Sequence, residues 1–86
     1  MSNITITGHA RFKIRQRTLD ENLVKQVVEN PERALSTEEG RRVYQARFFD
    51  SVEGKEMLLR VVTEDKLGSV HVITVYKTSK IDKYGR

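Results

Sequence analysis

The stretch EMLLRVVTEDKLGSVHVITVYK, residues 56–77, decides the fold. Its two runs rich in Leu, Val, Ile and Thr, 56–63 and 69–77, are typical of β-strands, and the polar segment 64–68 between them is typical of a hairpin loop. The second run is nearly continuous in β-branched residues, which predicts a central strand that is covered on both faces. We therefore expect an antiparallel hairpin in the middle of a sheet.

Three further strand signals precede this hairpin. Residues 42–49 read RVYQARFF and predict a strand rich in aromatic side chains, while residues 32–37 give a weaker strand signal. Residues 3–7 alternate between polar and apolar side chains, as a short strand does.

Two helices are expected between the first two strands. Residues 9–17 predict about two turns, with Ala10, Ile14, Phe12 and the stem of Lys13 facing inward. A second helix is expected after Asp20, whose carboxylate can accept a hydrogen bond as the N-cap, and it should end at Asn30-Pro31. The order strand–helix–helix–strand–strand–strand–strand predicts an α+β fold, with two N-terminal helices on one face of a four- to five-stranded, mainly antiparallel sheet.

Length and composition set further limits. The chain has 86 residues, 37% of them hydrophobic and 33% charged, which indicates a single domain over residues 1–86. It has no apolar run of about 20 residues and no visible signal peptide, so we expect a cytoplasmic protein without a membrane partner. Cysteine is absent and only His9 and His71 are present, so we expect neither a metal site nor a cofactor.

Positive charge gathers in two segments. The net charge is +4, but residues 9–17 carry +4, residues 18–40 carry −4 and residues 41–86 carry +4. If the fold brings the first and last segments together, they form a cationic patch that suits phosphate groups. The alternative is two solvated basic stretches with no ligand.

The first helix carries three candidate site residues in one stripe. His9, Lys13 and Arg17 are spaced i, i+4, i+8. A histidine at the positive end of a helix favours its neutral form, which suits a general acid or base, and Arg17 with Lys13 could hold a phosphate. The alternatives are a structural histidine and a solvated helix face.

The strands and the C-terminal tail supply the other candidates. Thr74 and Tyr76 share one strand face, and Arg60 should lie beside one of them if the hairpin pairs. Tyrosines can stack on nucleic-acid bases and lysines can pair with phosphates, which makes the tail a candidate RNA-binding segment through Tyr84, Lys80 and Lys83. The alternative is a sheet edge with a frayed basic tail.

These segments resemble a known family. The motifs TGHA at 7–10, RTLD at 17–20, VVENPE at 27–32, LRVV at 59–62 and TVY at 74–76 are similar in order and spacing to domain of unknown function 4258. The family pattern has Arg and Gly where this chain has Lys13 and Thr18. The family is similar in layout to RelE-type ribonuclease toxins, which implies two helices against a sheet that carries basic and hydroxyl residues.

Residue reasoning and resemblance together lead to three hypotheses. The first is a metal-independent endoribonuclease of the toxin type, with an antitoxin as its protein partner. Its catalytic residues would be His9, Arg17, Arg60 and Tyr76. Its RNA-binding residues would be Lys13, Thr74, Lys80, Lys83 and Tyr84. The second is a non-catalytic RNA-binding module that uses the same surface. The third is an interaction protein or homodimer whose seam contains Tyr44, Phe48 and Phe49, taken as exposed aromatic side chains.

Overall fold

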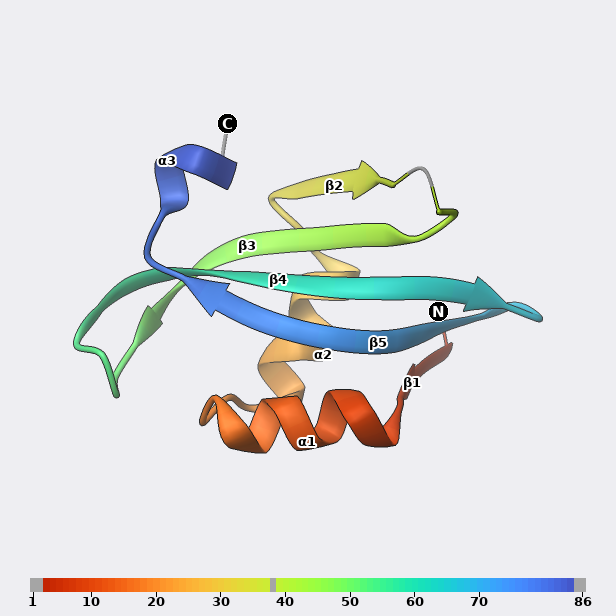
Figure 1. Ribbon diagram of the computed structural model, residues 1–86, viewed down its shortest axis with the longest axis horizontal. Helices are drawn as coiled ribbons and strands as arrows, with labels where there is room; N and C mark the ends of the chain where they lie inside the picture. Colours follow the sequence, from red (N-terminus) through yellow and green to blue (C-terminus); the bar gives the residue numbers. More distant parts are fainter. Residues whose placement is uncertain (1–2, 38, 85–86) are drawn as a thin grey trace.

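The expected hairpin lies inside a five-stranded sheet. A computed structural model describes residues 3–37 and 39–84. The hairpin consists of β4 (Lys55–Lys66) and β5 (Ser69–Thr78), which pair antiparallel. The strand order is β1-β5-β4-β3-β2, with β1 (Asn3–Ile6) parallel to β5, and β3 (Arg42–Asp50) antiparallel to both β4 and β2 (Arg33–Ser36). The sheet is therefore mixed but mainly antiparallel, and β5 is an interior strand as predicted (Figure 1).

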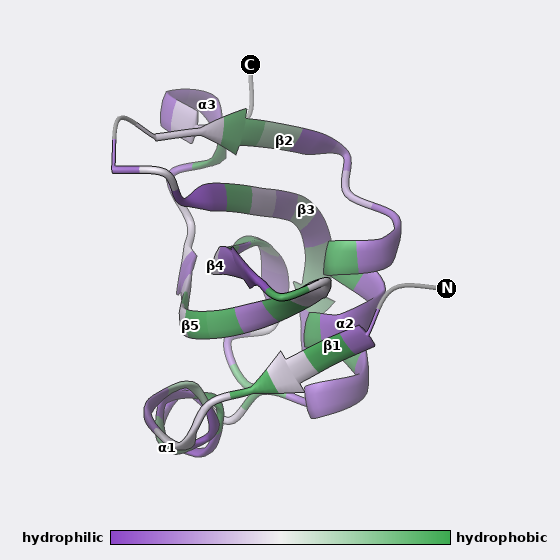
Figure 2. Cartoon of the chain, turned by 90° about the vertical axis from the view of Figure 1, so that its right-hand side faces the viewer, coloured by the Kyte–Doolittle hydropathy of each residue, from purple (hydrophilic) through white to green (hydrophobic). Residues whose placement is uncertain are grey.

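Two helices follow β1 and pack against the sheet. Helix α1 (Gly8–Gln16) lies beside β5, and α2 (Glu21–Glu29) crosses β3 and β4. Figure 2 views the sheet edge-on, with α2 on one side and a short helix that the sequence analysis did not predict, α3 (Ile81–Tyr84), on the other. The fold is α+β with the N-terminal helices in the predicted order.

The core lies between the sheet and the two longer helices. Val24, Val27 and Val28 of α2 meet Leu59 and Val61 of β4, all at most 8% exposed. Ala10 and Ile14 of α1 are also buried in this cluster. The predicted inward position of Phe12 is wrong, because this side chain is 58% exposed.

The helix ends follow local chemistry. The Asp20 carboxylate accepts a hydrogen bond from the Asn22 amide at 2.8 Å and caps α2 as predicted. Helix α1 ends in a Schellman motif: the Leu19 amide donates to the carbonyl of Ile14 and the Thr18 amide to that of Arg15. Thr18 has φ 55°, in the left-handed region, at the position where the family pattern has glycine.

No helix among the residues that the structure describes is long and apolar enough to span a membrane.

Candidate functional site

One row of residues crosses the sheet face opposite α2. Strand register places Arg33 beside Gln45, Gln45 beside Arg60, and Arg60 beside Tyr76, on β2, β3, β4 and β5 respectively. Because neighbouring strands align these positions, the four side chains share one face, here called the open face, and the four residues are called the central row. The row puts two guanidinium groups and a phenol on one line.

Arg60 is held in place by three neighbours. Its Nε donates to Gln45 Oε1 at 2.9 Å, and its Nη1 donates to the Tyr76 hydroxyl. Its guanidinium carbon lies 4.4 Å from the centroid of the Tyr84 ring and 5.5 Å from that of Tyr76, within the range of cation–π contact. The five N–H donors of an arginine leave three after these two hydrogen bonds, so Arg60 retains donors for a ligand.

Gln45 connects the row to the C-terminal helix. It is only 1% exposed, and its Nε2 donates to the backbone oxygen of Tyr84 at 2.6 Å. Both ends of the Gln45 amide are thus occupied, one by Arg60 and one by α3. The sequence analysis missed Gln45. The available signal was an uncharged polar side chain in the middle of the strand, between Tyr44 and Ala46.

The structure brings part of the predicted site together. Arg60 contacts both Tyr76 and Tyr84, and Thr74 lies two residues from Tyr76 on the same strand face, half-buried. Lys83 belongs to α3, and its Nζ lies 5.4 Å from the centroid of the Tyr84 ring. The expected frayed-tail alternative does not describe residues 81–84, because they form a helix.

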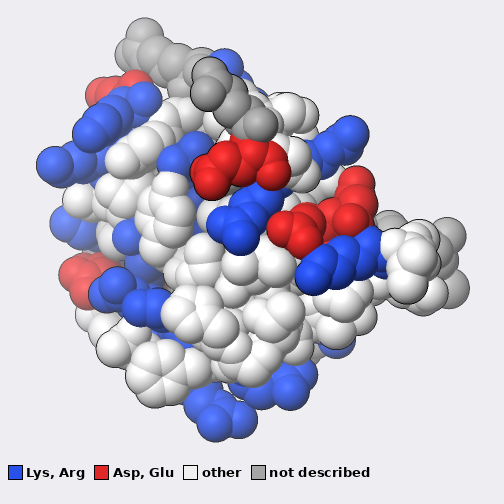
Figure 3. Space-filling model, turned by 45° about the vertical axis from the view of Figure 1, so that its right-hand side comes forward, with Lys and Arg blue, Asp and Glu red and all other residues white. Residues whose placement is uncertain are grey.

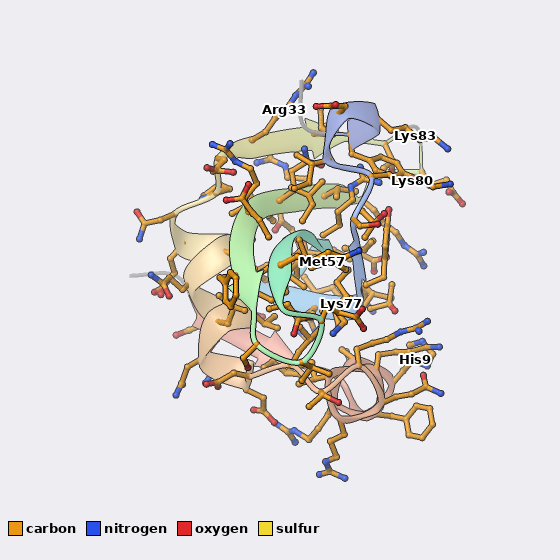
Figure 4. All side chains as sticks on the ribbon, turned by 90° about the vertical axis from the view of Figure 1, so that its left-hand side faces the viewer. His9, Arg33, Met57, Lys77, Lys80 and Lys83 are labelled. Atoms are coloured by element: carbon orange, nitrogen blue, oxygen red, sulfur yellow. The ribbon has the colours of Figure 1, made fainter. Side chains whose placement is uncertain are left out.

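The α1 residues lie at the other end of this side of the molecule. His9 is exposed in the first turn of α1, and Arg17 is the exposed C-cap. Lys13 is half-buried and its Nζ lies 3.4 Å from Gln16 Oε1. Figure 4 shows His9 projecting from α1 to the side of the sheet on which Lys80 and Lys83 also lie.

Basic side chains are spread over this side. In Figure 3 they run down the left of the molecule, from the α3 end to α1, with few acidic side chains between them. The acidic residues of the neighbouring segments are partly neutralised, since Arg47 binds Glu32 at 3.0 Å and Arg11 binds Glu21 at 2.9 Å. The hydrogen bonds from Arg47 lower the pKa of Glu32, which keeps this carboxylate ionised.

Lys77, by contrast, does not contribute to the open face. It lies on the helix-facing side of β5 and forms an ion pair with Asp50, and both side chains are at most 10% exposed. The hydrogen bond from Lys77 lowers the pKa of Asp50 below its ordinary value of 3.8. Lys77 therefore has a structural partner and is not presented to a phosphate.

The proposed aromatic seam has a different place in the fold. Tyr44 and Phe48 are half-buried against the core, and only Phe49 of the three is exposed, at 70%. The expectation of three exposed aromatic side chains is wrong, because β3 directs Tyr44 and Phe48 toward α2.

No group of three or more His, Asp or Glu side chains that could hold a metal ion occurs within residues 3–37 and 39–84. No curated protein and no solved structure matches this chain significantly. The model of a family described as domain of unknown function (DUF4258) matches residues 6–81, which is most of the sequence, and the chain belongs to this family.

Proposed function

We propose that this protein is a metal-independent endoribonuclease of the toxin type that binds RNA across the open face of its sheet. The observation that carries the proposal is the central row, in which Gln45 and Tyr76 orient Arg60 on a basic surface. An oriented guanidinium suits an RNA phosphate, because its planar fork can donate two parallel hydrogen bonds to one phosphate.

The chemistry would use the RNA's own 2′-hydroxyl. The 2′-oxygen attacks the adjacent phosphorus while a base takes its proton, and the P–O5′ bond breaks as an acid protonates the 5′-oxygen. The products are a 2′,3′-cyclic phosphate and a 5′-hydroxyl. His9 would act as the acid or base and Arg17 would stabilise the negative charge on the phosphorane, both from α1. Arg60, at the other end of this side, would hold a neighbouring phosphate of the same strand.

The remaining residues would bind and orient the strand. Tyr76 would hold its hydroxyl near the phosphate while Tyr84 offers a ring for base stacking, as aromatic residues do in single-strand binding. Phosphates on either side of the one at Arg60 would be bound by Lys80 and Lys83 near α3 and by Lys13 on α1. The Thr74 hydroxyl on β5 would donate a further hydrogen bond. An antitoxin protein that covers this face would block all of them at once.

One observation favours a second function. Two of the Arg60 donors are already used within the fold and its guanidinium is stacked under Tyr84. A group so firmly held suits binding without turnover, and the second candidate is therefore a non-catalytic RNA-binding module.

The decisive experiment measures cleavage and binding separately. Purified protein is incubated with end-labelled single-stranded RNA in EDTA, and products are tested for a 2′,3′-cyclic phosphate. The variants are His9→Gln and Arg60→Lys. The matched control is His71→Gln, because His71 is a half-exposed histidine on β5. We expect cleavage in the wild type and control, with at least a hundredfold loss in His9→Gln.

The outcomes separate the candidates. Loss of cleavage with retained RNA binding in His9→Gln supports the ribonuclease. Intact RNA with salt-sensitive binding by the wild type selects the binding module. Absence of RNA binding by the wild type overturns both.

A further inference from the structure

A groove runs along the open face between α3 and strands β2 and β3. Its volume is about 590 Å³, within the range of about 300–1,000 Å³ typical of small-ligand sites. Arg33 of β2 lines this groove, and Figure 4 shows it beside α3. The groove adjoins the central row, because Arg33 and Gln45 belong to both.

The base of the groove is rigid and partly apolar. Leu58 and Gln45 line it, and each is only 1% exposed. Ile81 adds apolar surface from the α3 side. The hydrogen bond from Gln45 to the Tyr84 carbonyl holds α3 against β3, and α3 forms the side of the groove opposite β2. The apolar surface of Ile81 suits contact with the face of an aromatic ring.

The rim of the groove carries both donors and acceptors. Arg33 and Arg47 supply guanidinium groups, and Glu32 and Asp82 supply carboxylates. Arg47 uses its Nε and Nη2 for Glu32, which leaves its Nη1 for a ligand. A carboxylate has about four lone-pair sites and can accept from a ligand while it keeps another partner.

We propose that this groove binds a guanine base of the RNA strand whose phosphate lies at Arg60. The inference rests on the proposed function and names its sequence preference. Guanine presents two acceptors, O6 and N7, which arginine recognises with two donors. The same base presents the N1 and N2 protons beside them, which suit a carboxylate such as Asp82. Adenine offers only one donor group along these edges, and the pyrimidines have no N7.

The groove also lies at a suitable place for such a base. Arg33 and Arg60 are separated by one strand, so their backbones lie about 10 Å apart. Gln45 between them contacts Arg60 directly and lines the groove. A nucleotide can therefore place its base in the groove and its phosphate on the remaining donors of Arg60.

Mononucleotide titration tests the preference without cleavage. The probes are 5′-GMP, 5′-AMP, 5′-CMP and 5′-UMP, followed by amide chemical shifts in the full-length protein. We expect 5′-GMP to bind at least tenfold more tightly than 5′-AMP, and Asp82→Asn to reduce this ratio below threefold. Asp65→Asn, in the exposed end of β4, is the matched control and should keep the ratio.

A second variant guards against a change in α3. Arg33→Gln leaves α3 intact and should also remove the preference for 5′-GMP, whereas Arg11→Gln on α1 should leave it unchanged. Equal affinity for all four nucleotides, or an unchanged preference in both groove variants, overturns the guanine site.

Mapping of RNA cleavage then distinguishes the two proposals. Cleavage beside guanines supports both of them. Cleavage without any base preference, together with equal mononucleotide affinities, overturns the guanine site and leaves the ribonuclease intact. A preference for 5′-GMP without cleavage overturns the ribonuclease and supports the guanine site in an RNA-binding module.

Discussion

Gln45 and Arg60 face each other across β3 and β4, and the Arg60 Nε donates to Gln45 Oε1 at 2.9 Å. The other end of the same amide donates to the backbone oxygen of Tyr84. A single buried glutamine thus sets the direction of the central guanidinium and anchors α3. The site and the C-terminal helix depend on each other through this side chain.

Replacement of Gln45 by leucine tests this double role. Gln45→Leu removes both hydrogen bonds and leaves the Tyr84 carbonyl and Arg60 Nε without these partners, which we expect to lower the free energy of unfolding by about 1–3 kcal/mol. Urea unfolding measures the loss. Gln26→Leu, at an exposed position of α2, is the control and should change stability by less than about 0.5 kcal/mol. Equal effects of the two variants would refute the anchoring role.

Much of the fold could be predicted from the sequence because its signals are local. The cap at Asp20, the stop at Asn30 and the β-branched run of β5 each follow from the preferences of a few neighbouring residues. Helix α3 has only four residues and one aliphatic side chain, Ile81, so it has no periodicity to detect. A tertiary hydrogen bond from Gln45 holds it.

The candidate site was predicted only in part, for a similar reason. The neighbourhood of Arg60 and Tyr76 followed from the hairpin, but their direct pairing also depends on a register shift between Val62 and Thr63, which the sequence does not reveal. Gln45 and Arg33 join them through pairings between β2, β3 and β4, which depend on the whole sheet. The placement of α1 relative to the row likewise depends on packing against β5 and not on the spacing of His9, Lys13 and Arg17.

Binding of RNA should depend on salt through the lysines near α3. For single strands the slope of log K against log salt is about −0.7 per neutralised phosphate. Lys80→Gln and Lys83→Gln should each make the slope shallower by about 0.7, measured by fluorescence anisotropy between 50 and ~300 mM salt. Lys55→Gln is the control, because Lys55 is exposed at the start of β4 and strand alternation places it on the face opposite Arg60, so it should leave the slope unchanged. A common slope for all four proteins would exclude contact of α3 with the strand.

The ion pair between Asp50 and Lys77 should make the stability of the fold depend on pH in the acidic range. The hydrogen bond from Lys77 lowers the pKa of Asp50, so the pair stabilises the fold above the ordinary pKa of 3.8 and loses this effect as the pH falls through the lower folded value. Asp50→Asn should lower the unfolding midpoint by several degrees at pH 7. It should also weaken the pH dependence below about pH 4, as measured by thermal unfolding from pH 7 to pH 2.

The control for this pair is an exposed carboxylate. Glu53→Gln, in the loop after β3, removes one negative charge from the same end of the sheet without breaking a buried pair. Its thermal unfolding midpoint should stay within about a degree or two of the wild type at pH 7. If the two variants had the same pH profile, the buried pair would not be the cause.

Thr18 should be a site where glycine increases stability. Its φ of 55° is strained for a β-branched residue, whereas glycine adopts this conformation readily. Thr18→Gly should raise the free energy of unfolding by about 1 kcal/mol, measured in urea. Thr18→Ala shortens the same exposed side chain but keeps a Cβ, so it should gain less than the glycine variant. A gain equal to that of glycine would place the cause in the side chain and not in φ.

Expression in cells tests whether the ends of α1 take part in a toxic activity. If His9 transfers a proton and Arg17 stabilises the phosphorane, induction of the wild type should arrest growth with loss of total RNA, and His9→Ala with Arg17→Ala should restore growth. The matched control is His71→Ala with Arg15→Ala, which removes a histidine from β5 and an exposed arginine from α1. Arrest by the control but not by the site variant would support catalysis from α1. Healthy growth with the wild type at the same protein level would count against a toxin. Recovery with both double variants would show that loss of basic charge on α1 relieves the arrest, and not the specific loss of His9 and Arg17.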